Sequence, residues 1–162
     1  TLINHRWLRF IKSKEIRILI VVGLLFRFLL SLCYMNVSQF PDSSSFMVLA
    51  KRMLDFNLVD YTGERSPGYP LLLFFAFGFK PLAVLYQFAI GILTSILWFK
   101  TLLNFDYNKK QSLWITMFMQ SFIHFYFYET SILIETLSLF LVSIVFYLLT
   151  TNYLEEKNVK KD

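Results

Sequence analysis

Four long apolar runs constrain this sequence more than any other feature. Each run holds 17 to 21 residues with at most one charged side chain, and together they cover residues 18–35, 81–99, 112–128 and 130–150. A helix needs roughly 20 apolar residues, with a range of about 17–25, to cross the hydrocarbon core of a bilayer. The sequence therefore predicts an all-α membrane protein with about four transmembrane helices in one domain, residues 1–162.

The composition supports this class and excludes others. Apolar residues make up 56% of the 162 residues and charged residues only 17%, whereas soluble domains are about a quarter charged. The single cysteine, Cys33, excludes an internal disulfide framework, and two histidines leave little for a histidine metal site. The net charge of +5 comes largely from cations that flank the apolar runs, so no nucleic-acid surface is expected.

The positions of the cations predict the orientation. Eleven of the 16 Lys and Arg residues lie in residues 1–17, 100–111 and 151–162, whereas residues 36–80 balance four cations with four acids. Cytoplasmic segments carry the excess of Lys and Arg, so both ends of this chain are predicted to be cytoplasmic. The first run is interpreted as an uncleaved signal anchor. We expect a multi-pass protein of the plasma (inner) membrane, with residues 36–80 outside.

Two short helices are predicted in the extracytoplasmic segment. Apolar residues recur at helical spacing from Phe46 to Leu54, which predicts an amphipathic helix on the membrane surface. Asp42 or Ser43 is its expected N-cap. The nine-residue run Leu71–Phe79 is too short to span a bilayer and is predicted to be re-entrant or interfacial, with Pro70 at its first position.

A stiff connection is predicted between these two helices. Pro67 and Gly68 suit the central positions of a type II turn. Such a turn would hold Arg65 and Tyr69 close to the membrane plane.

Three motifs resemble the C-type (GT-C) membrane glycosyltransferases, in the bacterial group similar to protein O-mannosyltransferases and lipid A aminoarabinose transferases. Asp42, then LAKRMLDFNL and YTGERSPGYPLLL, look like the first outer loop of that family. LYQFAIGILTSIL resembles its second span, and SILIETLSLFL resembles an acidic element at the outer start of a later span. The resemblance covers about residues 16–150. Many relatives have a second acid where Ser43 follows Asp42. Relatives also have more spans, so we expect the N-terminal portion of a longer architecture or a truncated product.

The resemblance implies transfer of a sugar from a polyprenyl-phosphate donor to a glycan, lipid or protein acceptor outside the membrane. Asp42 is the expected general base, with a helix N-cap as the alternative. Arg65 is a candidate for the carrier phosphate, because guanidinium forms forked hydrogen bonds to phosphate, with lipid headgroups or Glu64 as alternative partners. Tyr69 and Lys80 are further substrate-binding candidates, although Lys80 also suits snorkelling to the interface. The alternative function is a non-catalytic transport or assembly subunit, or an inactive remnant.

Two charges within the apolar runs need partners. Arg27 should face the protein interior, where it either positions the carrier or braces the bundle by pairing with an acid. Glu135 is expected to bind substrate by orienting the acceptor, to help hold a divalent metal, or to pair with Arg27. His124 is interpreted as a polar contact within the bundle rather than a metal ligand. No metal ligand and no cofactor is assigned.

Overall fold

The computed structural model describes residues 13–33, 37–59 and 61–159, and most of them are helical. The helices, in chain order, are α2 (Lys14–Cys33), α3 (Pro41–Leu54), α4 (Gly68–Phe75), α5 (Lys80–Asn104), α6 (Lys109–Gln120), α7 (Ile123–Glu129) and α8 (Glu135–Val159). Within the described ranges, extended pairing is limited to one parallel bridge between Ser38 and Ser131. The predicted all-α class is confirmed.

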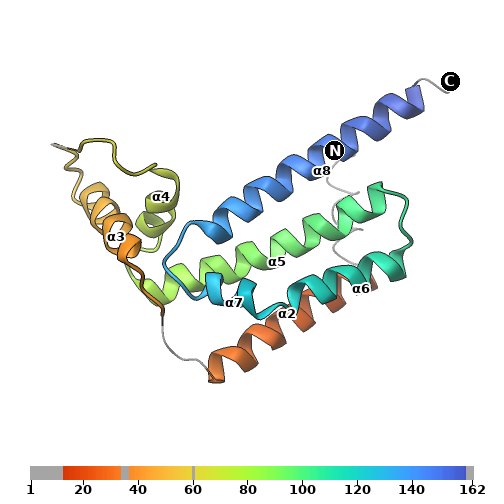
Figure 1. Cartoon of the computed structure of the whole chain (residues 1–162), viewed down its shortest axis with the longest axis horizontal. Coiled ribbons are helices and arrows are strands. Elements are labelled where there is room, and N and C mark those ends of the chain that lie inside the picture. The colour runs from red at the N-terminus through yellow and green to blue at the C-terminus, as the bar shows by residue number, and fades with distance from the viewer. Residues whose placement is uncertain (1–12, 34–36, 60, 160–162) are drawn as a thin grey trace.

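Among the described residues, three helices are long and apolar enough to cross a membrane: α2, α5, and α8 over Glu135–Tyr153. Figure 1 shows α5 in the middle of the bundle, with α8 along one side and α6, α7 and α2 along the other. The first turn of α2, the α5–α6 connection and the last turns of α8 lie at one end of the bundle, and α3 and α4 lie at the other (Figure 1). The described parts of the three cation-rich segments therefore share one end.

The third predicted span is not one continuous helix. Residues 109–129 form α6, with 12 residues, and α7, with 7, so at about 1.5 Å per residue neither reaches across a bilayer alone. The break lies at Ser121 and Phe122, where the Ser121 hydroxyl donates to the Phe118 carbonyl over 2.7 Å. The third and fourth runs are separated by residues 130–134, because α7 ends at Glu129 and α8 begins at Glu135.

Apolar packing holds the long helices together at the end that carries the cations. Ile16 and Leu19 of α2 pack with Phe99 of α5 in one buried cluster. Elsewhere α2 and α8 expose large apolar side chains, for example Phe28 and Leu149. Apolar side chains can face lipid because they have no polar groups that need hydrogen-bond partners. The exposed apolar surfaces of α2 and α8 are therefore consistent with a membrane protein.

Helix α3 packs against α4 through Phe46, Ala50 and Leu73 in a second buried cluster. A helix in this segment is confirmed, but its predicted N-cap was wrong. Helix α3 begins at Pro41, and Ser43 Oγ accepts a hydrogen bond from the Phe40 backbone N–H over 2.8 Å. Asp42 therefore lies in the first turn of α3 and is not the N-cap.

Helix α4 also begins earlier than predicted. Pro67 has a ψ of −11°, so Pro67 and Gly68 lead directly into α4 and do not form a type II turn. Pro70 is consequently the third residue of the helix. Helix α4 ends at Phe75, because Phe77 and Gly78 adopt left-handed conformations with φ of 52° and 67°. The chain then enters α5 at Lys80.

Candidate functional site

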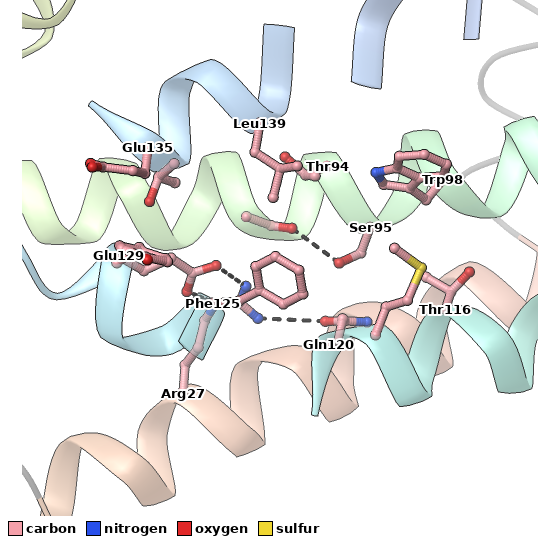
Figure 2. A pocket seen from close by; sticks show the side chains of 14 residues that line it. Arg27, Thr94, Ser95, Trp98, Thr116, Gln120, Phe125, Glu129, Glu135 and Leu139 are labelled. Carbon is pink, nitrogen blue, oxygen red and sulfur yellow. Dashed lines mark hydrogen bonds and ion pairs between the residues drawn. The ribbon is translucent and has the colours of Figure 1, made fainter. Parts of the chain in front are cut away.

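A buried ion pair joins α2 to α7 inside the bundle. Arg27 Nε donates to Glu129 Oε2 over 2.7 Å, and Arg27 Nη2 pairs with the other carboxylate oxygen. The two side chains are only 6% and 4% exposed. Figure 2 shows Arg27 rising from α2 between Glu129 and Gln120 of α6. The prediction that Arg27 pairs with an acid is confirmed, but the acid is Glu129 rather than Glu135.

Two glycines make room for this pair. A Cβ on Gly91 of α5 would overlap the Glu129 carboxylate and crowd the Arg27 guanidinium. A Cβ on Gly23 of α2 would overlap the Gln120 side chain. The Gly23 carbonyl also accepts a hydrogen bond from Arg27 Nη1 over 3.1 Å. The side chains of Glu129 and Gln120 therefore occupy space that a side chain at Gly91 or Gly23 would fill.

A cavity of about 220 Å³ borders the ion pair, with walls from α2, α5, α6, α7 and α8. In Figure 2, Gln120, Trp98 and Phe125 surround it together with Glu129. Three polar atoms of lining residues are buried without a hydrogen-bond partner: Trp98 Nε1, Gln120 Nε2 and Thr136 Oγ1. Glu135, the first residue of α8, also lines this cavity but is itself exposed.

A second ion pair lies on the outside of the bundle, at the end that carries α3 and α4. Arg65 pairs with Asp42, 23 residues away, and the two side chains are 36% and 59% exposed. The Arg65 guanidinium also lies over the Phe46 ring, 5.2 Å from its centroid. Tyr61 steadies this loop, because its hydroxyl hydrogen-bonds to the backbone of Arg65. The structure thus brings together two sequence-predicted residues, and the carboxylate partner of Arg65 is Asp42 rather than Glu64.

The remaining predicted site residues lie in different environments. Tyr69 is fully buried, and its hydroxyl donates to Gln87 Oε1 over 2.7 Å. Burial, together with the nearby Glu135, raises the pKa of Tyr69 above its ordinary value, so the hydroxyl stays a donor. Lys80 donates to Gln39 Oε1 over 2.9 Å on the surface. Tyr69 is therefore a packing residue here, whereas Lys80 is accessible.

Gln87 is an important residue that the sequence reasoning missed. Its side-chain amide donates to the carbonyls of Tyr128, Glu129 and Ser131, over 3.1, 2.9 and 2.8 Å. Because its oxygen accepts from Tyr69, one side chain ties α4 and α5 to the α7–α8 connection. A glutamine within the uncharged run 81–99 was the available signal.

Two further expectations concern polar groups on α7 and α8. His124 is exposed, so its predicted polar contact within the bundle is wrong. In the described part of the chain, no three His, Cys, Asp or Glu side chains gather closely enough to hold a metal ion. A metal-binding role for Glu135 therefore finds no supporting ligands among these residues.

No protein-family model, no curated protein and no solved structure matches this chain. The two ion pairs, the cavity and the sequence motifs are therefore the features of this chain that bear on its function.

Proposed function

We propose that this chain is a membrane glycosyltransferase that moves a sugar from a polyprenyl-phosphate donor to an acceptor at the end of the bundle that carries α3 and α4. The observation that carries the proposal is the exposed pair of Asp42 and Arg65. One residue offers a carboxylate base and the other a forked phosphate donor. They meet although they come from different segments, α3 and the loop before α4.

The proposed chemistry is a direct displacement at the anomeric carbon. Asp42 accepts the proton of an acceptor hydroxyl as that oxygen forms a bond to the anomeric carbon. The bond between this carbon and the phosphate oxygen breaks, and the phosphate leaves with the electron pair. Arg65 donates hydrogen bonds to the phosphate oxygens and stabilises their developing charge.

Binding of the donor substrate changes the partner of Arg65. Without substrate, Arg65 occupies an oxygen of the Asp42 carboxylate. A phosphate competes for the same guanidinium, and exposed ion pairs are worth only about 0–1 kcal/mol, so exchange costs little. Donor binding therefore releases the Asp42 carboxylate at the moment when a base is needed.

The proposal places the protein in the plasma (inner) membrane with α3 and α4 at the outer lipid surface. The broken segment α6–α7 then forms a fourth crossing, and the cation-bearing end faces the cytoplasm. Phe56 and Phe77 support this placement, because they are 90% and 77% exposed in loops after α3 and α4. Both adopt left-handed backbone conformations that bulky residues rarely take. Insertion of the two rings into lipid offsets this strain.

Activity of Asp42→Asn tests the proposal. Native membrane vesicles containing the chain, whose glycans, lipids and proteins serve as acceptors, are given polyprenyl-phosphate mannose or polyprenyl-phosphate aminoarabinose, and release of polyprenyl phosphate is measured. Loss of a positioned base lowers turnover by about 10²–10⁴-fold. Asp55→Asn is the matched control, because Asp55 is an exposed carboxylate at the other end of α3, and it keeps full activity. Retention of more than about a third of the activity in Asp42→Asn contradicts a catalytic base at this position.

A charge exchange separates chemistry from structure. Asp42→Arg combined with Arg65→Asp restores an ion pair between the same positions but exchanges the base and the phosphate donor. We expect stability close to that of the original protein and no turnover. Turnover by this double variant would show that the ion pair has only a structural role. No donor consumption by the unmodified chain favours the non-catalytic alternative.

A further inference from the structure

A second cavity lies between the end of α5 and the last turns of α8, and no residue of either ion pair lines it. Its volume is about 320 Å³. Figure 1 shows these helix ends at the end of the bundle away from α3 and α4. The polar lining consists of Asn104, Asp106 and Thr150, and the apolar lining includes Phe105, Phe146 and Tyr153.

The polar atoms still available in this cavity are acceptors. Asn104 Nδ2 donates to the hydroxyls of Thr150 and Thr151, over 3.1 Å each, so its remaining capacity is the carbonyl oxygen Oδ1. The Thr150 hydroxyl in turn donates to carbonyls of its own helix. Asp106 is exposed, and within the described ranges neither its carboxylate nor Asn104 Oδ1 has a hydrogen-bond or ion-pair partner. The cavity therefore offers two unpaired acceptors, one of them charged.

Three aromatic rings line the same cavity. Phe105 and Tyr153 are exposed, and the Phe146 ring packs on Trp98 with 5.7 Å between their centroids. A carboxylate next to aromatic faces suits an ammonium group, because the oxygens accept its hydrogen bonds and the rings attract its charge. A divalent cation needs more oxygen ligands, and no three His, Cys, Asp or Glu side chains gather in the part of the chain that the structure describes.

The position of the cavity favours a lipid as the source of the ammonium group. Phe146 and Leu149 are exposed residues of the apolar span of α8, which extends to Tyr153. At about 1.5 Å per residue, Phe146 lies about 10 Å further along α8 into the bilayer than Tyr153. The acceptors, by contrast, lie where α5 ends. The cavity is therefore apolar on the bilayer side and polar at the surface, in the same order as a phospholipid.

Charges in the α5–α6 connection match a zwitterionic head. Asp106 is the only acid in residues 100–111, and the exposed Lys109 and Lys110 follow it at the start of α6. A carboxylate favours the ammonium of such a head, and the two nearby cations favour its phosphate. An ammonium compound without a phosphate would match only the first of these charges.

We propose that this cavity binds a phospholipid whose head carries a primary ammonium, such as phosphatidylethanolamine. Asp106 and Asn104 Oδ1 accept hydrogen bonds from the ammonium, and the Phe105 ring contacts it. The acyl chain follows Phe146 and Leu149 along α8. This inference goes beyond the proposed function, because it concerns the opposite end of the bundle and involves no sugar transfer.

The test compares two lipids that differ only at the head nitrogen. The full chain in detergent micelles is titrated with dioctanoyl phosphatidylethanolamine or dioctanoyl phosphatidylcholine, and native mass spectrometry gives the apparent Kd of the first bound lipid. Both lipids are zwitterionic, but only the ethanolamine head has N–H donors. We expect it to bind about three- to tenfold more tightly. Free ethanolamine, which has no acyl chains, should not raise the unfolding temperature at the concentration at which the lipid saturates the chain.

Two variants make the test specific to this cavity. Asp106→Asn removes the charge but keeps the fold, because Asp106 has a φ of 63° and Asn tolerates this left-handed conformation as well as Asp does. It should weaken phosphatidylethanolamine binding by about three- to tenfold and abolish the preference over phosphatidylcholine. Phe105→Leu removes a ring but keeps an apolar side chain, and it should weaken binding of both lipids by about two- to fivefold. Asp55→Asn is the matched control, because Asp55 is an exposed carboxylate outside the cavity, and it should leave both affinities unchanged.

Equal binding of the two lipids by the unmodified chain overturns the inference. An unchanged preference in Asp106→Asn, or the same loss in Asp55→Asn, also overturns it. Stabilisation by free ethanolamine equal to that by the lipid contradicts a lipid source, and unchanged affinities in Phe105→Leu contradict the ring contact. Release of polyprenyl phosphate, measured separately, tests the proposed function and does not bear on this cavity.

Discussion

The protein contains two arginine–carboxylate pairs that differ in surroundings. Arg27 and Glu129 are almost completely buried between helices, whereas Asp42 is exposed and Arg65 partly exposed at the end of the bundle. The buried pair is bidentate and is extended by Gln120 and the Gly23 carbonyl. The exposed pair has one carboxylate contact and a neighbouring aromatic ring.

This difference in burial indicates that the two ion pairs have different roles. Removing one partner of a buried pair costs about 3–5 kcal/mol, because the other charge is left without compensation. An exposed pair contributes about 0–1 kcal/mol, so its members can exchange partners at little cost. The buried arginine is suited to holding α2 against α7, and the exposed arginine is suited to binding a ligand.

The largest expected effect comes from Glu129→Gln. The substitution keeps the shape of the side chain but leaves the buried Arg27 without a counter-charge, so it should destabilise the protein by about 3–5 kcal/mol. Thermal unfolding in detergent measures the loss. The double variant with Arg27→Gln removes both charges and should recover part of that stability. Equal destabilisation in the single and double variants would show that charge compensation is not the reason for the pair.

A smaller effect is expected from Gly91→Ala. The new methyl group would occupy the position of the Glu129 carboxylate, and overpacking of this kind costs about 1–3 kcal/mol. Gly68→Ala is the matched control, because the nearest atom to its added Cβ is Ser66 Oγ at 3.9 Å. Unfolding midpoints of the two variants should therefore differ. If they are the same, the space beside Gly91 is not needed for the ion pair.

The smallest effect is expected from Arg65→Gln. Loss of an exposed ion pair should change stability by no more than about 1 kcal/mol, while donor turnover falls because the forked phosphate contact is lost. Thermal unfolding and polyprenyl phosphate release, measured on the same preparation, separate the two consequences. A large loss of stability would show that Arg65, like Arg27, has mainly a stabilising role.

Much of the fold could be predicted, because hydrophobic length and periodicity are local properties of the sequence. The runs from Ile18, Pro81 and Thr130 correspond to α2, α5 and α8, and the helical spacing from Phe46 predicted the core of α3. The break at Ser121 could not be found in this way, since no Gly or Pro marks it. The position of this break is determined by tertiary contacts rather than by the local sequence.

The partner of Arg27 was missed for the same reason. Gln120 and Glu129 are nine residues apart, so in an unbroken helix, at 3.6 residues per turn, they would point about 180° apart. The break turns α7 so that both side chains reach the same guanidinium. The expectation of one continuous helix in the third run therefore favoured Glu135 as the partner of Arg27. The meeting of Asp42 with Arg65 was equally hidden, because it requires α3 and the loop before α4 to fold together.

The separation of 102 residues between Arg27 and Glu129 has a consequence for how the protein is made. Ribosomes add about 5–20 residues per second, so Arg27 is synthesised roughly 5–20 s before its counter-charge. A lone arginine at the centre of an inserting helix costs at least about 2.5–3.5 kcal/mol. The leucines, isoleucines and phenylalanines of α2 must outweigh this cost by themselves, and a ribosome stalled before residue 129 leaves a cation in lipid without its partner.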